Sequence, residues 1–207
     1  PHDQAHCRGE EQKQTARFET ILTTLRELIT SCKDGAERVK KIVLDLRTFS
    51  RTDDSCLVLV DLREGIDSTL NLLAQSYQDR ITVHRDYGDV PRVECYPSQI
   101  NQVFMNVLQN AAQAIPGKGE VWIRIEADGG QIWIAIKDSG SGIAEHHLKQ
   151  IFVPFFTTKA VGSGTGLGLS ISYGIIQKHG GKIWATSATG EGSEFTVELP
   201  LRLSRKP

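Results

Sequence analysis

Side chains that could bind a cation recur along one predicted helix of this sequence. Asn106, Asn110 and Gln113 stand at i, i+4 and i+7 within residues 98–115, a spacing that places them in one stripe on a helix. Beside the stripe runs an apolar face, formed by Ile100, Val103, Phe104, Val107, Leu108, Ala111 and Ile115. Amide oxygens are good Mg²⁺ ligands where phosphates supply the negative charge. Solvated or helix-capping amides are the alternative, and on the stripe alone they are the simpler explanation.

Two glycine-containing segments could bind the base and the phosphates of a nucleotide. Residues 138–142 read Asp-Ser-Gly-Ser-Gly after a predicted strand. A carboxylate there can accept a hydrogen bond from an exocyclic amine, and the glycines let a flat ring approach the backbone, although a plain turn is the commoner origin of such a motif. Residues 162–170 read Gly-Ser-Gly-Thr-Gly-Leu-Gly-Leu-Ser and open into a helix, whose free amides and positive end suit a polyphosphate.

The second glycine segment differs from two common phosphate-binding motifs. It is not a P-loop, because no Gly-Lys-Ser/Thr ends it. It is not a dinucleotide fingerprint either, because no parallel strand–turn–helix unit with a later acidic residue surrounds it. Between the two glycine segments, residues 151–159 read Ile-Phe-Val-Pro-Phe-Phe-Thr-Thr-Lys. The phenylalanines of this stretch would ordinarily be assigned to a hydrophobic core.

The elements that must position these residues alternate in type. We expect strands at residues 57–62, 81–84, 93–96, 121–127, 132–137, 182–187 and 194–199, and helices at residues 66–76, 98–115 and 167–178. Turn residues at 128–130 and 189–192 predict hairpins. Helices mixed with hairpin-linked strands indicate an α/β (α+β) fold. We expect a two-layer sandwich, with a mixed sheet carrying helices on one face.

A long heptad-patterned helix should precede the sandwich. Apolar or small residues alternate in steps of three and four at Phe18, Ile21, Leu25, Leu28, Cys32, Gly35, Val39, Ile42, Leu46 and Phe49. Such a helix either packs on its own domain or dimerises, and the length of the heptad register favours dimerisation. Residues 50–55 have the composition of a linker.

Composition excludes several classes of partner. The chain has 24 basic and 25 acidic side chains and a net charge of −1, so we expect no nucleic acid and no membrane contact. No apolar run is long enough for a bilayer span, and no signal peptide is visible at the start. The four cysteines are scattered without a C-x-x-C pair, which favours a reducing cytoplasm.

In order and spacing, five segments resemble the ATPase superfamily of histidine kinases, DNA gyrase, heat-shock chaperones and mismatch-repair proteins. Residues 102–114 resemble its N box, 138–142 its first glycine box, 152–159 its F box, 164–169 its second glycine box and 190–200 its closing strands. The F box is characteristic of the kinases. Residues 37–51 resemble the second helix of the kinase dimerisation and histidine-phosphotransfer domain. Asn106 stands where hydrolytic members often carry a glutamate base, which favours transfer over hydrolysis.

The resemblance implies a set of site residues with ATP and Mg²⁺ as ligands. Asp138 would accept the adenine amine, Asn110 with help from Asn106 would hold Mg²⁺, and Lys159 would approach the terminal phosphates from a lid at residues 157–166. Asn106, Asn110 and Lys159 would be the catalytic residues. The ATP-binding residues would be Asn106, Asn110, Gln113, Asp138, Gly140, Gly142, Ile143, Phe152, Thr158, Lys159, Gly164, Thr165, Gly166, Leu167, Gly168, Leu169 and Ser193.

The implied activity is that of the ATP-binding catalytic part of a two-component sensor histidine kinase. It would transfer the ATP γ-phosphoryl to a histidine for relay to a response-regulator aspartate. We expect residues 1–54 to be a partial dimerisation helix that forms a homodimer, and residues 55–207 to be the catalytic domain. The partner would be a response-regulator receiver domain, in the cytoplasm, although the parent protein could be membrane-anchored. The alternative is an ATP-binding regulatory or scaffold module without kinase activity.

The acceptor histidine of such kinases has no clear counterpart here. Among the six histidines, His2 followed by Asp3 comes nearest, but residues 3–17 lack the apolar stripe of a hairpin helix. The expectation is therefore that the acceptor was removed by truncation or lies on another chain. This chain should then be inactive in self-phosphorylation.

Overall fold

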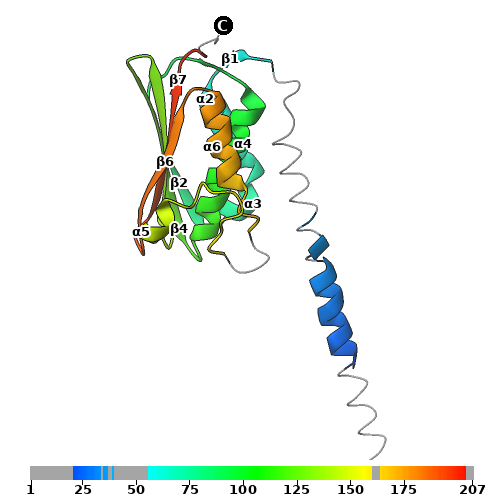
Figure 1. The fold of residues 1–207 in the computed structure, drawn as a ribbon. Helices are drawn as coiled ribbons and strands as arrows, with labels where there is room; N and C mark the ends of the chain where they lie inside the picture. The colour runs from blue at the N-terminus through cyan, green and yellow to red at the C-terminus, as the bar shows by residue number, and fades with distance from the viewer. Residues whose placement is uncertain (1–20, 34, 37–38, 40–55, 160–163, 204–207) are drawn as a thin grey trace, which may run out of the picture.

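A five-stranded mixed sheet forms one layer of the domain, with helices on one of its faces (Figure 1). The computed structural model describes residues 21–33, 35–36, 39, 56–159 and 164–203. The strand order is β2 (Ile81–Tyr87), β4 (Gly119–Asp128), β5 (Gln131–Asp138), β7 (Gly192–Pro200) and β6 (Lys182–Ala188). The β2–β4 pair is parallel and the other pairs are antiparallel. The predicted α/β sandwich is therefore confirmed.

Three helices cover the inner face of the sheet: α2 (Leu62–Leu72), α4 (Pro97–Ala114) and α6 (Gly168–Lys178). Two helices of four residues each, α3 (Ala74–Tyr77) and α5 (Glu145–Leu148), lie in the connections. A separate antiparallel pair joins β1 (Val58–Val60) to β3 (Val93–Cys95). Helices α4 and α6 thus pack next to each other on the sheet.

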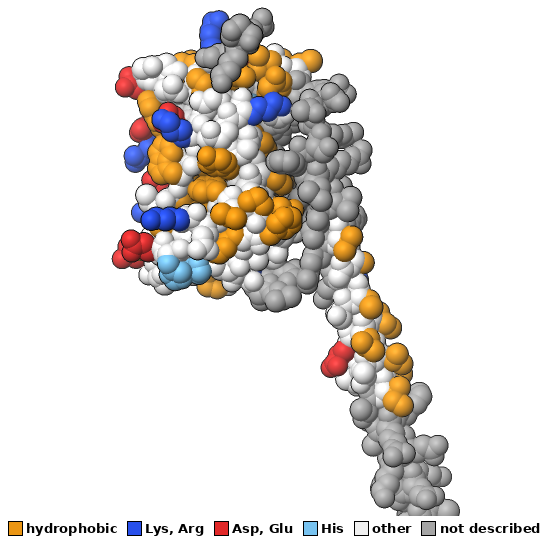
Figure 2. All heavy atoms as spheres, viewed as in Figure 1, with side chains coloured by type: hydrophobic (Ala, Val, Ile, Leu, Met, Phe, Trp, Pro, Cys, Tyr) orange, Lys and Arg blue, Asp and Glu red, His pale blue; other side chains and the backbone are white. Residues whose placement is uncertain are grey.

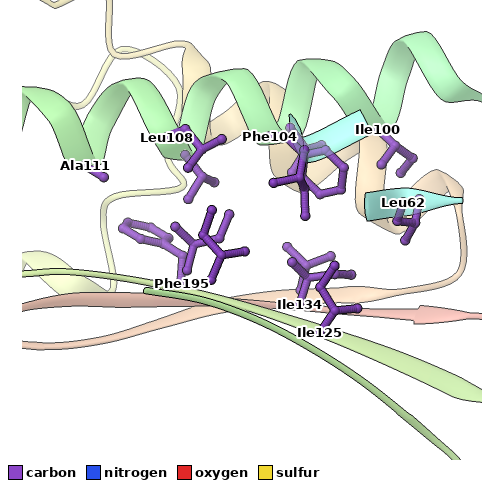
Figure 3. Close-up of a cluster of buried hydrophobic side chains, with 14 of the residues drawn as sticks. Leu62, Ile100, Phe104, Leu108, Ala111, Ile125, Ile134 and Phe195 are labelled. Atoms are coloured by element: carbon purple, nitrogen blue, oxygen red, sulfur yellow. The ribbon is translucent and has the colours of Figure 1, made fainter. Parts of the chain in front are cut away.

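The core forms where the apolar face of α4 meets alternate residues of the central strands (Figure 3). Strand residues of one parity face the helices because side chains alternate across a strand. The residues buried in this layer include Ile100, Phe104, Leu108, Ala111, Ile125, Ile134 and Phe195. Truncating Phe104 to alanine would cost about 3–5 kcal/mol, which is typical of a fully buried aromatic side chain. This packing fixes the height and rotation of α4 above the sheet.

The C-terminal end of α4 is held by an arginine from a distant segment. Arg80 donates from its guanidinium to the carbonyls of Ala112 (2.5 Å) and Ile115 (2.8 Å), and its Nε donates to the carbonyl of Ser76 (2.8 Å). The last carbonyls of a helix have no intrahelical partner, so a cationic donor satisfies them and also interacts favourably with the helix dipole. Arg80 therefore anchors the end of α4 without a C-cap glycine.

The outer face of the sheet carries all three tryptophans of the chain. Trp122, Trp133 and Trp184 alternate with the buried residues of β4, β5 and β6, so they point away from the helices. Trp122 stacks on His84 of β2, with ring centroids 5.5 Å apart and an interplanar angle of 12°. The aromatic rings thus lie on the side of the sheet that the helices leave open.

Three predicted boundaries are wrong near the start of the domain. The strand expected at residues 57–62 ends at Val60, because Asp61 caps α2 by accepting from the backbone amide of Arg63 (3.0 Å). The helix expected at residues 66–76 therefore begins at Leu62, and it ends at Leu72, before the separate turn of α3. The short helix α5 was not predicted.

The described part of the heptad segment, residues 21–33, 35, 36 and 39, is helical. Its apolar side chains are exposed, as the orange spheres along this helix show (Figure 2), and they include Ile21, Leu25, Leu28, Ile29 and Val39. The remainder of the predicted helix, the linker at 50–55 and His2 lie outside the described residues. Within the described ranges, none of the helices has the length and apolar character needed to cross a membrane.

Candidate functional site

A cavity of about 410 Å³ opens beside α4, between the end of β5 and the start of α6. This volume is within the range of small-ligand sites. All the predicted ATP-binding residues except Gly140, Phe152 and Leu167 line it. The lining residues that the sequence did not single out are Gln102, Met105, Gln109, Ala114, Ser141, Ile151, Phe156, Thr157 and Phe195. The motifs, which are far apart in sequence, therefore meet around one space.

The carboxylate of Asp138 lies in the wall of the cavity, at the end of β5, and the residue is only 3% exposed. Its Oδ1 accepts from the backbone amide of Gly140 (2.8 Å), and the backbone of Ser193 donates to it as well. Burial raises the pKa of the carboxyl above its usual 3.8, and these two hydrogen bonds oppose the rise. The remaining acceptor capacity of this buried group suits a donor on a ligand.

Two glycines of the first glycine segment lie very close to the backbones of other segments. A Cβ on Gly140 would lie 2.6 Å from the carbonyl oxygen of Ala114, and one on Gly142, whose φ is +70°, would lie 2.0 Å from that of Ala188. Only glycine fits such approaches without a shift of the chain. Gly140 therefore acts by letting the loop pack against the end of α4, which explains why it does not line the cavity.

Two amide oxygens in the wall of the same cavity accept hydrogen bonds from the side chain of Lys159. The Lys159 ammonium donates to Asn110 Oδ1 (2.9 Å) and to Gln113 Oε1. Asn110 and Gln113 stand one turn apart on α4, and Lys159 follows the phenylalanine segment. No group of three or more His, Cys, Asp or Glu residues in the described part of the chain could hold a metal ion. The two amide oxygens are ligands of the kind that Mg²⁺ accepts, provided that a ligand's phosphates bring the negative charge.

Asn106, the third amide of the predicted stripe, has different partners. Its Nδ2 donates to the Gly168 carbonyl (2.8 Å) and to Ser172 Oγ (3.0 Å), both on α6. Its Oδ1 accepts from Gln102 Nε2 (3.1 Å). Asn106 lines the cavity, but its hydrogen bonds are directed to α6 and to its own helix.

The start of α6 borders the cavity. Gly168 and Leu169 line it, and no side chain caps the first turn. The positive end of a helix with uncapped amides attracts anions. Before it, Gly166 has a φ of +67°, and its carbonyl accepts from the amide of Phe155 (2.9 Å), which ties the phenylalanine segment to the second glycine segment. Residues 160–163 of the predicted lid lie outside the described residues.

Two of the three phenylalanines, Phe152 and Phe156, are half-buried and pack against the hydrophobic core. Phe156 lines the cavity and lies 5.3 Å from the ring of His147. Phe152 lies 5.8 Å from the ring of Tyr173 on α6, and Phe155 is 64% exposed. Only Phe156 contributes to the cavity wall, because the φ of +67° at Phe155 turns the chain between the two half-buried rings.

Comparisons with known proteins place residues 95–203 in one family, described as histidine kinase-, DNA gyrase B- and HSP90-like ATPase. The chain is 37% identical over 173 residues to the sensor histidine kinase ZraS of Escherichia coli strain K12, which covers 83% of the chain and 37% of ZraS. It is 41% identical over 169 residues to sporulation kinase E of Bacillus subtilis strain 168, which covers 80% of the chain and 23% of that kinase. The chain thus spans well under half the length of these relatives.

Two solved structures support the same assignment. The catalytic domain of histidine kinase ThkA superposes with a TM-score of 0.66 at 34% identity, covering 73% of this chain and 99% of that one. ThkA in complex with the response regulator protein TrrA gives a TM-score of 0.70 at 29% identity, covering 84% of this chain and 50% of that one.

Proposed function

Because the chain belongs to the histidine kinase-, DNA gyrase B- and HSP90-like ATPase family, and its relatives are sensor histidine kinases, we propose that residues 55–207 are the catalytic domain of a two-component histidine kinase. The domain binds ATP and transfers its γ-phosphoryl to a histidine, from which a response-regulator aspartate receives it. The observation that carries the proposal is that one cavity is lined both by the buried carboxylate of Asp138 and by the amide pair that holds the Lys159 ammonium.

The base of ATP lies beside Asp138 in the cavity. The carboxylate accepts a hydrogen bond from the exocyclic amine of adenine, and its two backbone donors hold it in place for that contact. Ile143 and Phe195 line the same cavity and supply apolar surface for a flat ring. A buried polar group that needs a partner discriminates strongly against ligands that cannot provide one, so Asp138 selects for adenine.

The phosphates lie beside Asn110, Gln113 and the start of α6. Asn110 and Gln113 hold Mg²⁺, Lys159 contacts the terminal phosphates, and the first-turn amides of α6 bind the phosphate oxygens. Bound Mg²⁺ supplies neutralisation of the phosphate charge. The chain's own contribution is to orient the γ-phosphoryl, which accounts for most of the catalysis of phosphoryl transfer.

Transfer to a side chain is favoured over hydrolysis. Among the described residues that line the cavity, Asp138 is the only carboxylate, and in this proposal it contacts the adenine. Asn106 cannot take a proton from water, since a neutral amide is not a base. We therefore propose that none of the described lining residues acts as a general base on water beside the γ-phosphate.

We propose the remaining partners from the same family relation. Residues 1–54 contribute a dimerisation helix, which the exposed apolar residues of its described part support. A response-regulator receiver domain is the second partner, in line with the solved ThkA complex with TrrA. The ATP-dependent reaction takes place in the cytoplasm.

A labelling experiment tests the proposal. The chain is incubated with γ-labelled ATP and Mg²⁺, alone and with a histidine-bearing dimerisation hairpin of the family added in trans. We expect acid-labile label on the hairpin, lost with Asn110→Ala and absent with α-labelled ATP. If the chain binds ATP tightly yet labels no acceptor, it is an ATP-binding regulatory module and the kinase proposal is wrong.

A further inference from the structure

We propose that Asn106 is a positioning residue that fixes the first turn of α6 against α4, and that the cation ligands on α4 are Asn110 and Gln113. The identity of the cation, Mg²⁺ bound together with ATP, rests on the proposed function. This division of roles separates three amides that look equivalent in the sequence.

The carboxamide of Asn106 is already engaged at both ends. Its Nδ2 carries two hydrogens and has two acceptors, the Gly168 carbonyl at 2.8 Å and Ser172 Oγ at 3.0 Å. Its Oδ1 accepts from Gln102 Nε2 at 3.1 Å. The amide orientation follows from these partners, because the opposite one would set its oxygen against the Gly168 carbonyl. To serve a metal, Asn106 would have to reorganise this arrangement.

The partners of Asn106 on α6, Gly168 and Ser172, lie in close contact with α4. Ser172 is fully buried, and its hydroxyl also donates to the Gly168 carbonyl (2.9 Å). A Cβ on Gly168 would lie 3.4 Å from the Asn106 side chain, about van der Waals distance, so α4 and α6 are closely packed here. The three groups form one hydrogen-bonded cluster across the interface between α4 and α6. Polar clusters in such interfaces fix a single arrangement of the elements that they join.

The turn that Asn106 holds is the one that borders the cavity. Gly168 is the first residue of α6, and Gly168 and Leu169 line the cavity. Asn106 therefore acts on nucleotide binding through α6, by keeping the first turn and its amides in place beside the cavity. Phosphate binding to preorganised amides avoids the cost of ordering them during binding.

The amide pair farther along α4 is the one that holds a positive charge. Lys159 Nζ donates to the oxygens of both Asn110 and Gln113, which marks these two oxygens as a cation-binding pair. Both side chains line the cavity. Mg²⁺ prefers oxygen ligands of this kind.

Substitution by aspartate distinguishes a ligand from a positioning residue. Asn110→Asp keeps an oxygen for the metal. Asn106→Asp keeps an oxygen too, but it loses both donors and turns a carboxylate oxygen toward the Gly168 carbonyl. If Asn106 positions α6, aspartate should be no better there than alanine.

The test uses the 207-residue chain with the substitutions Asn106→Ala, Asn106→Asp, Asn110→Ala, Asn110→Asp and Gln113→Ala. ATP binding is measured by calorimetry across a Mg²⁺ titration, and amide exchange is followed across α6 in the nucleotide-free chain. We expect Asn110→Ala and Gln113→Ala to raise the half-saturating Mg²⁺ concentration roughly tenfold, the scale of one lost polar contact, and Asn110→Asp to recover part of it.

Both Asn106 variants should leave half-saturation by Mg²⁺ within about twofold. They should speed exchange roughly tenfold at the amide of Ile171, which donates to the Leu167 carbonyl across the first turn of α6, as expected when a hydrogen bond that holds this turn is lost. ATP affinity at saturating Mg²⁺ should fall as well. A shift of the Mg²⁺ curve by Asn106→Ala as large as that by Asn110→Ala, or its rescue by Asn106→Asp, would overturn the assignment. If the unsubstituted chain fails to bind Mg·ATP, the proposed function fails, and unchanged exchange in the Asn106 variants then refutes the positioning role separately.

Discussion

Replacing Asp138 with asparagine should weaken ATP binding while leaving the fold as stable or making it more stable. The carboxyl is buried, and burial raises its pKa above the 3.8 of the unfolded chain. The folded state therefore holds the proton more readily than the unfolded state does. The stability that comes from this group is fully present below pH 3.8 and is lost as pH rises through the folded pKa. Asparagine does not titrate, so the variant lacks this loss.

The two effects differ in size because the same group meets different partners. Asparagine Oδ1 can still accept from the Gly140 amide, where it trades a charged acceptor for a neutral one, a difference of about 1 kcal/mol per bond. That loss is offset because no charge remains to be buried. For ATP, the amine loses a charged acceptor and can meet an amide donor instead. The cost of about 2–3 kcal/mol corresponds to roughly 30- to 150-fold weaker binding.

Calorimetry with Mg·ATP and thermal unfolding at several pH values measure both quantities. We expect the melting temperature of Asp138→Asn, relative to the unsubstituted chain, to increase as pH rises from about 4 to 7. Asp128→Asn is the matched control, because Asp128 ends β4 at an exposed hairpin and lies outside the cavity. Unchanged ATP affinity would refute the adenine contact. A melting temperature that falls together with affinity would mean that Asp138 acts through the fold.

Three further predictions follow from single contacts. Burial lowers the pKa of His179 below 6.5, while the hydrogen bond of its ring to the Ile175 carbonyl opposes the shift. The contribution of His179 to stability should therefore be complete above pH 6.5 and decline below it. Thermal unfolding should show that His179→Gln removes this pH dependence. Gly166→Ala should cost about 1–3 kcal/mol, because a φ of +67° strains any Cβ and this one would lie 2.4 Å from the Phe155 carbonyl carbon; calorimetry should show weaker ATP binding. Arg80→Met should lower the free energy of unfolding in urea by about 1.5–3 kcal/mol, since the last carbonyls of α4 lose a charged donor.

The elements that sequence reasoning placed well are those with a long apolar period. Residues 98–115 were predicted as a helix, and α4 runs over Pro97–Ala114, because seven apolar positions repeat on one face and a proline suits the first turn. The β4–β5 hairpin was also predicted, since two alternating strands flank Asp-Gly-Gly. Helix α5, with four residues, is too short to show a period at all.

Contacts between distant segments could not be read from the same patterns. The stripe of Asn106, Asn110 and Gln113 follows from helix geometry, yet the partners of Asn106 are 62 and 66 residues away. A periodicity identifies which side chains share a face but says nothing about what lies opposite. One missed residue could have been found: Phe195 lies two positions after Ser193 on β7, and alternation along a strand places both on the same face.

The placement of the tryptophans makes the domain's own fluorescence a reporter of the sheet and not of the nucleotide. Trp122, Trp133 and Trp184 point away from the helices, and none of them is among the residues that line the cavity. ATP should therefore fill its site with little change in tryptophan emission, and unfolding curves recorded by emission can be compared directly with and without ligand. A new tryptophan at Phe156, in the cavity wall, would add a signal that responds to occupancy. A large emission change in the unsubstituted chain would indicate that ligand binding reaches through the core to the opposite face.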